Sequence, residues 1–262
     1  MIKLFRNIRQ KLLAEGKTAN YLKYAVGEIV LVVIGILIAL SINNWNENRK
    51  AKIQEIKQLK NIQEDILLDK TDALWNIGAH SLFVISQKEL LEYMMSEAMK
   101  PKKTIAYENA LGIPIILTLH ESSFFNLRAN DINIITNEKL KKQIANYYDN
   151  FAKVILTIEN DLDEYKTYSL IKPYFINYFI YANETAVVGD FEADNGDYYS
   201  PKVELNKYVL ADTLGLKKDE DFKNILAESI RFITIKLDLY RDFLKRIQEL
   251  NESIDKELKK IE

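Results

Sequence analysis

The side chains best suited to acid–base chemistry or zinc binding are the two histidines, His80 and His120, in a chain that has no cysteine. They are far apart in sequence and form no His-Glu-x-x-His pattern, so a zinc site is not indicated. The chain also lacks a glycine-rich phosphate loop and a Gly-x-Ser-x-Gly turn. We therefore predict no catalytic residue, no metal and no cofactor, and we expect the protein not to be an enzyme.

An acidic, turn-prone run at Asp190–Gly196 is the second candidate, because alternating carboxylates are typical of calcium-binding loops. Its glycine comes one position too late for such a loop. Pro201 stands where the closing glutamate should be. We interpret the run as a solvated loop rather than a calcium site.

The most unusual carboxylate is Glu28, which lies in an otherwise apolar segment. On a helix, Glu28, Gly35 and Ala39 share one face, where small residues let a second helix approach closely. A carboxylate within a membrane segment is costly and usually faces protein or water. Three readings stay open: Glu28 reaches the headgroup region, packs against another helix, or lines an ion path.

The segment that holds this carboxylate is the only one apolar enough to cross a bilayer, and we predict a transmembrane helix at 21–46. No charged residue occurs from 29 to 46. Tyr21, Tyr24 and Trp45 stand near its two ends, where aromatic rings prefer the headgroup zone, and we expect them to be interface anchors.

Two alternatives to a transmembrane helix are a cleaved signal peptide that ends near Ala39–Ser41 and a buried helix of a soluble protein. The long polar stretch before the segment, and the absence of a comparably apolar partner in the sequence, disfavour both. Lysine and arginine flank the segment on both sides with a mild excess before it, which favours a cytoplasmic N-terminus. We therefore expect the C-terminal domain to be extracytoplasmic, which in a Gram-negative cell means periplasmic.

Residues 1–20 carry apolar side chains at three- and four-residue steps between basic ones, which predicts an amphipathic helix in the membrane interface. The alternative is a solvated basic tail. For the whole chain, the formal net charge is -2, with acidic and basic residues interleaved. This pattern excludes a nucleic-acid binder that works by bulk charge.

Residues 47–262 have few prolines and glycines and several apolar heptad patterns, which predicts an extracytoplasmic domain of long helices packed as an antiparallel bundle or coiled coil. We therefore expect an all-α fold, with irregular segments at 101–136 and 174–220. The clearest pattern is near the C-terminus, where we expect a buried face that includes Leu237, Tyr240, Leu244, Ile247, Ile254 and Leu258. Asn251 interrupts that face: either it fixes the helix register, or the helix has left the bundle there.

Aromatic residues gather at 165–181, and Tyr174, Tyr178 and Tyr181 are the candidates for a surface that stacks on a ligand. Packing within the bundle is the simpler interpretation, because aromatic clusters most often form helix–helix contacts.

Several segments resemble a widespread bacterial family of single-span membrane proteins that is catalogued only as a domain of unknown function. The N-terminal resemblance is close, and the central one is looser. The segments are Ile2–Arg9, Tyr24–Glu28, Ile34–Lys50, Ser122–Asn130, Ile134–Leu140 and Tyr147–Tyr148. The resemblance implies an anchored helical periplasmic domain and supplies no catalytic residue or cofactor. Residues 174–220 fall outside it.

These features predict a membrane-anchored structural or interaction protein, with the lipid bilayer and either a second copy or another membrane or periplasmic protein as partners. The alternative is an extracytoplasmic sensor or ligand-binding domain that uses the aromatic and acidic region 165–200. A span with few cytoplasmic residues gives a sensor little output machinery of its own.

Overall fold

The computed structural model describes residue 7 and residues 18–189 and 202–262. The predicted interfacial helix lies almost wholly outside these residues, as does the acidic run Asp190–Gly196. The chain divides into two compact units, residues 1–55 and 56–262, and each is described by itself.

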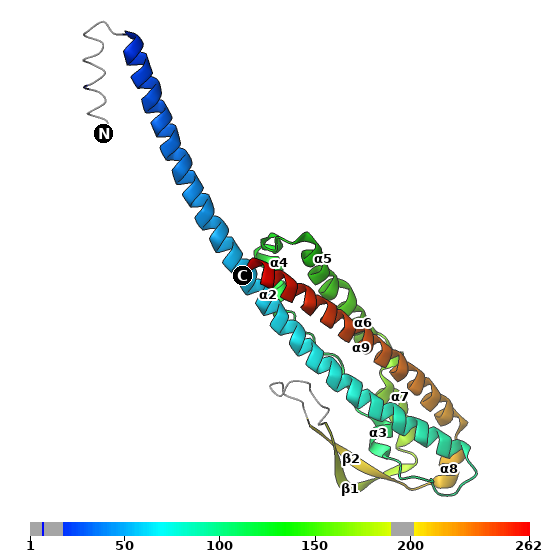
Figure 1. The fold of residues 1–262 in the computed structure, drawn as a ribbon. Helices are drawn as coiled ribbons and strands as arrows, with labels where there is room; N and C mark the ends of the chain where they lie inside the picture. The colour runs from blue at the N-terminus through cyan, green and yellow to red at the C-terminus, as the bar shows by residue number, and fades with distance from the viewer. Residues whose placement is uncertain (1–6, 8–17, 190–201) are drawn as a thin grey trace. The chain divides into compact units, whose positions relative to one another are not determined.

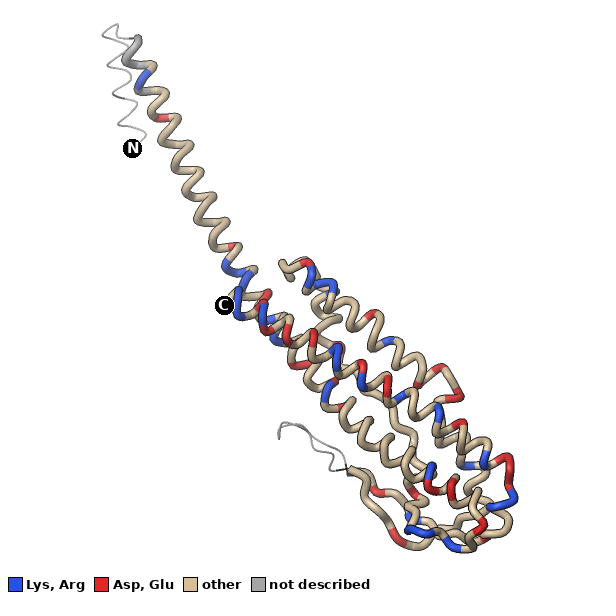
Figure 2. Tube along the Cα trace, turned by 45° about the vertical axis from the view of Figure 1, so that its right-hand side comes forward, with Lys and Arg blue, Asp and Glu red and all other residues tan. Residues whose placement is uncertain are grey.

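Helix α2 (Thr18–Met95) contributes to both units. It contains no proline, and its many straight-chain residues favour an unbroken helix. In the first unit it includes the predicted span. Among the described residues this is the one helix long and apolar enough to cross a membrane, and no residue of its most apolar 18-residue window is buried. Figure 2 shows a long uncharged stretch of α2, in tan, that follows one blue and one red band near the start of the helix.

The second unit contains the remaining elements. In chain order they are α3 (Tyr107–Leu111), α4 (Ser122–Asn130), the 3-10 helix η1 (Ile132–Ile134), α5 (Glu138–Asn146), the π-helical turn η2 (Tyr147–Ala152), α6 (Lys153–Asp161), the 3-10 helix η3 (Asp163–Tyr165), α7 (Thr167–Phe175), β1 (Phe179–Val188), β2 (Val203–Leu210), α8 (Thr213–Lys218) and α9 (Glu220–Ile261). Long N-terminal and C-terminal helices dominate, so the predicted helical fold class is confirmed.

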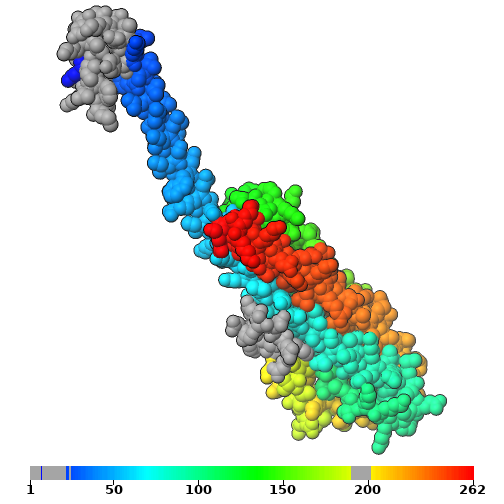
Figure 3. All heavy atoms as spheres, viewed as in Figure 1, coloured from blue at the N-terminus to red at the C-terminus, as the bar shows by residue number. Residues whose placement is uncertain are grey.

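Helix α9 runs antiparallel to the part of α2 that belongs to the second unit (Figures 1 and 3). Polar contacts between the two helices show this direction. Residues with successively higher numbers on α2 contact residues with successively lower numbers on α9. The contacts are Lys60–Glu262 at 2.7 Å, Gln63–Asn251 at 2.9 Å, Asn76–Tyr240 at 3.4 Å and Gln87–Ser229 at 2.9 Å.

The buried face of α9 includes the predicted Leu237, Tyr240 and Ile247, whereas Leu244 is only partly buried. Phe243 and Leu250, which the heptad pattern left outside the face, are almost fully buried. The face is wider than a coiled-coil stripe because α9 packs against α5, α6 and α7 as well as α2. Asn251 accepts a hydrogen bond from Gln63 of α2, so the end of α9 remains in the bundle.

The helical segment after Asn137 starts at a side-chain cap, since the Asn137 side chain accepts hydrogen bonds from the N–H groups of Lys139 and Leu140. The segment is interrupted by the π-helical turn η2. The extra residue in such a turn shifts the helix face, and Tyr147 and its neighbour Tyr148 are both buried as a result.

The segment 174–220, predicted to be irregular, instead contains a β-hairpin. Strands β1 and β2 pair antiparallel with Phe179 opposite Leu210 and Val188 opposite Val203. Asn183 adopts a φ of 58°, in the left-handed region that asparagine tolerates, where the register shifts. The hairpin was not predicted because the aromatic residues at the start of β1 follow directly on those of α7, so that the two groups resemble a single aromatic cluster and not the start of a strand.

Candidate functional site

A chain segment without regular secondary structure, residues 112–121, crosses the second unit between α3 and α4; we call it the strap. It begins at Gly112, whose φ of 68° favours glycine. A side chain at this position would meet the Phe83 ring at 3.1 Å. Because the strap joins no sheet, its N–H groups need other acceptors where they are buried.

Carboxylates from α2 and α6 supply those acceptors. The N–H groups of Leu117, Thr118 and His120 donate to the side chains of Glu159, Asp72 and Asp69 at 2.8, 2.8 and 2.7 Å, respectively. Just beyond the strap, the N–H of Ser123 donates to Asp65 at 2.8 Å. Buried and partly buried acidic side chains thus accept the hydrogen bonds that a neighbouring strand would accept in a sheet.

Asp69 is the most enclosed of these groups, with a fully buried side chain. It accepts a hydrogen bond from the Tyr147 hydroxyl at 2.7 Å, and the Nδ1 atom of His120 lies 3.0 Å from it. Burial raises the pKa of Asp69 to about 6, although the hydrogen bonds from Tyr147 and His120 act in the opposite direction.

A buried ion pair lies on the α6 side of the strap. The ammonium of Lys236, on α9, is 3.1 Å from Glu159. The same carboxylate accepts hydrogen bonds from the Tyr240 hydroxyl and from the strap. Burial lowers the pKa of Lys236, while Glu159 opposes that shift.

His80, on α2, is only 3% exposed, and among the described residues neither of its ring nitrogens has a hydrogen-bond partner. Its ring stacks on Tyr240 with the centroids 5.9 Å apart and meets Phe83 edge-on at 6.0 Å. Burial, and then the charge of Lys236, hold the pKa of His80 well below its ordinary value, so the ring is neutral. A buried imidazole without partners is unusual and needs an explanation.

A cavity of about 230 Å³ is lined by His80, Glu159 and Lys236, but not by Asp69. Its wall is made by three parts of the second unit: the strap, the turn that leads into α7, and the buried polar side chains of α2, α6 and α9. The lining residues are His80, Ile113, Pro114, Ile115, Ile116, Glu159, Asn160, Tyr165, Lys166, Thr167, Tyr168, Ser169 and Lys236. We call it the strap cavity.

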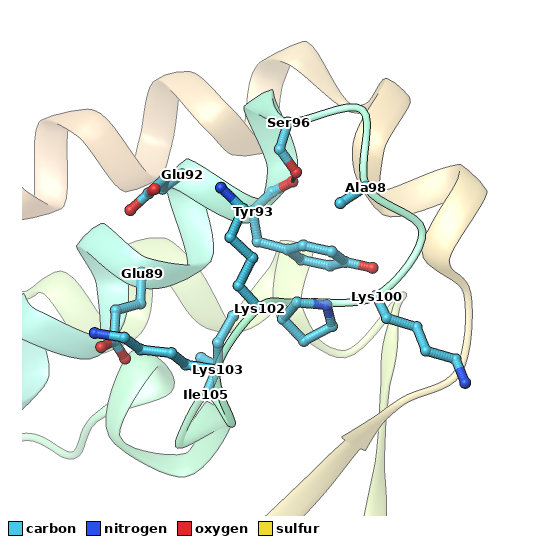
Figure 4. A pocket seen from close by; sticks show the side chains of 10 residues that line it. Glu89, Glu92, Tyr93, Ser96, Ala98, Lys100, Lys102, Lys103 and Ile105 are labelled. Carbon is cyan, nitrogen blue, oxygen red and sulfur yellow. Dashed lines mark hydrogen bonds between the residues drawn. The ribbon is translucent and has the colours of Figure 1, made fainter.

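A second cavity, of about 200 Å³, lies between the end of α2 and the loop that follows it. Figure 4 shows Lys102 and Lys103 reaching from that loop toward Glu92 and Glu89 of α2, with the Tyr93 ring between the helix and the loop. Charges of both signs are mixed in the wall of this cavity, because Lys100 also lines it beside the two glutamates and the other two lysines.

The predicted membrane-face residues all lie on α2 in the first unit. Glu28 is partly exposed and Ala39 exposed, and nothing lies within 4 Å of the position that a side chain would take at Gly35. Trp45 is 66% exposed, with the Arg49 guanidinium 5.8 Å from its ring. The side chains of Tyr21 and Tyr24 lie outside the described ones.

The three tyrosines predicted as a ligand surface do not form one platform. Tyr174 and Tyr178 both stack on Phe222, at 5.8 and 6.1 Å, and the Tyr178 hydroxyl donates to Asp219 at 2.6 Å. Tyr181 stands apart on β1, half exposed. Packing, the simpler of the two sequence interpretations, describes Tyr174 and Tyr178.

The roles of Asp69, Glu159 and Lys236 were not predicted from the sequence, and neither histidine was predicted to take part in a site. A signal was present on α2, where acidic and amide side chains repeat at helical steps beside the apolar face (Asp65, Asp69, Asp72 and Asn76). Such a repeat inside an amphipathic helix indicates buried polar contacts. Glu159 and Lys236 carry no comparable local signal.

The described residues define a mainly helical protein with one candidate membrane span, a β-hairpin and a hydrophobic core that also holds several buried polar side chains. Residues 28–95 match the model of a family of unknown function (DUF6090), so the predicted resemblance to such a family is confirmed over this part of α2. Neither the curated proteins nor the solved structures that were compared include a match to the chain.

Proposed function

We propose that this protein is a membrane-anchored interaction protein, held in a bacterial inner membrane by the span in α2. The supporting observation is the exposed apolar window of that helix, which no residue of the described chain covers. An apolar surface of this length in water would be strongly unfavourable, whereas lipid accommodates it. The flanking basic residues favour a cytoplasmic N-terminus and a periplasmic bundle.

The proposed interaction is with a second copy of the chain in the plane of the membrane. Glu28, Gly35 and Ala39 recur on one face of α2, and the space beside Gly35 is open. Close approach of two helix backbones at small residues is a common mode of association in lipid. The proposal assigns no reaction to the chain: the carboxylates of the bundle that we have described bind backbone N–H groups of the strap.

Replacing Gly35 by leucine tests this proposal. The added side chain would keep the two backbones apart, so self-association in a membrane two-hybrid assay should fall severalfold. The control is Val33→Leu, which adds bulk to an exposed position off that face. Equal signals from the two variants at equal membrane levels would show that the Glu28–Gly35–Ala39 face takes no part in association.

A further inference from the structure

We propose that a cavity between the start of α5 and the end of α9 binds a phosphate group, which comes either from the headgroup of an anionic lipid or from a soluble phosphate compound. The cavity has a volume of about 180 Å³. This is several times the roughly 30 Å³ that one water molecule occupies in the liquid, so a phosphate group fits. The inference goes beyond the proposed self-association, and only its lipid source rests on the proposed membrane anchor.

The first argument is the charge of the lining. Three lysines line the cavity, namely Lys139 on α5 and Lys256 and Lys260 on α9. Among the described residues that line it, the acidic one is Glu257, so the wall carries two more positive than negative side chains. A cavity lined mainly by one sign of charge attracts an ion of the opposite sign. We call this the basic cavity.

The second argument is that the acid in the wall is engaged, whereas two of the lysines are not. Glu257 is 4% exposed and accepts hydrogen bonds from the side chains of Asn137 and Lys260. Within the described part of the chain, Lys139 and Lys256 form neither an ion pair nor a side-chain hydrogen bond. Two ammonium groups in the wall therefore remain to bind an anion.

The third argument is a neutral donor beside the two lysines. Gln143 of α5 also lines the cavity, and its side-chain amide is without a hydrogen bond to any described residue. The start of α5 is not itself the donor, because Asn137 already accepts from the N–H groups of Lys139 and Leu140. A phosphate group has several acceptor oxygens and can bind two ammonium groups and an amide at once.

The fourth argument is the place of the cavity on the second unit. Lys260 of the cavity wall comes two residues before Glu262, which pairs with Lys60 of α2 at 2.7 Å. Lys60 follows soon after the predicted span, which ends at residue 46. This end of the bundle is therefore tethered to the bilayer by a short stretch of chain, which makes an anionic lipid a ready source of the phosphate group.

The test is isothermal titration calorimetry on the full-length protein in nonionic detergent, in a phosphate-free buffer of low ionic strength. The probes are inorganic phosphate, glycerol, and glycerophosphoglycerol, which is the water-soluble headgroup of phosphatidylglycerol. We expect saturable binding to one site per chain for at least one of the two phosphate probes, and none for glycerol. Tighter binding of glycerophosphoglycerol assigns the lipid source, whereas equal or tighter binding of inorganic phosphate assigns the soluble source.

The double variant Lys139→Gln, Lys256→Gln should bind the better probe about tenfold or more weakly, because two charge-assisted hydrogen bonds are lost. The matched control is Lys142→Gln, Lys259→Gln, which changes two exposed lysines of the same helices outside the cavity and should bind as the wild type does. All four lysines are exposed, so both variants should fold, and circular dichroism checks this.

The proposal is overturned if neither phosphate probe binds saturably, if glycerol binds as well as they do, or if the two double variants lose affinity equally. The last result would mean that the whole charged surface, and not the basic cavity, attracts the anion. None of these outcomes depends on self-association, which the Gly35→Leu assay measures separately.

Discussion

Asp69 shows how one buried side chain links the strap to the pH response of the fold. Its carboxylate is charged in both the folded and unfolded states above a pH of about 6. The folded state then bears the cost of desolvating that charge. Between about pH 6 and about pH 4 the folded state binds a proton that the unfolded state does not. This group therefore makes folding more favourable as the pH falls through that window.

We predict that Asp69→Asn removes this contribution. Asparagine keeps an acceptor for the N–H of His120 and has no charge to desolvate. As the pH falls from 7 to 4, the free energy of unfolding of the wild type should therefore increase more than that of the variant. The difference between the two increases should be about 3 kcal/mol or less. Denaturant unfolding of the full chain in detergent at a series of pH values measures this difference. Parallel pH profiles for the two proteins would contradict it.

The individual polar contacts could not be predicted from the sequence, for a physical reason. Asp69 and Glu159 bond to strap residues 51 and 42 positions away, and local periodicity carries no information about such pairs. By contrast, the cap at Asn137 was predictable, because a capping side chain bonds to N–H groups only two and three residues ahead.

At the scale of elements, α2 and α9 were predictable because their apolar spacing is regular and breakers are rare. Some residues of the buried face of α9 lie one position away from those predicted. The heptad pattern assumes a single partner helix, whereas α9 packs against several. The strap and the hairpin were not found, because their pairing depends on residues remote in sequence.

The observed face of α9 predicts a clear difference between two leucines. Leu250 is 3% exposed within the main core, whereas Leu244 is only partly buried. We expect Leu250→Ala to lower the free energy of unfolding by about 2–5 kcal/mol, because it removes fully buried methyl groups and leaves a cavity. Leu244→Ala is the matched control and should cost clearly less. Denaturant unfolding monitored by circular dichroism compares them, and an equal or reversed order would favour the heptad face.

At the scale of the whole molecule, the span should make the protein integral to the membrane. We predict that the intact chain stays in the membrane fraction after carbonate washing. The double variant Val33→Lys, Leu37→Lys should be released, because each lysine at the centre of a span costs about 3 kcal/mol. Ile53→Lys, at an exposed position outside the predicted span, should remain bound.

Two further measurements test whether the span is retained in the mature protein and which side of the membrane the bundle occupies. Mass spectrometry that found a mature chain beginning near Ile42 would show a cleaved signal peptide instead of a span. A periplasm-dependent reporter fused after Glu262 should be active; a stable but inactive fusion would place the bundle in the cytoplasm.

The strap also has a consequence for the order in which the second unit folds. Its hydrogen bonds join residues 42 to 51 positions apart, and closing such loops costs entropy before any contact is gained. The acceptors on α2 and α6 come together only when those helices have packed. We therefore expect the strap to dock only after α2 and α6 have packed.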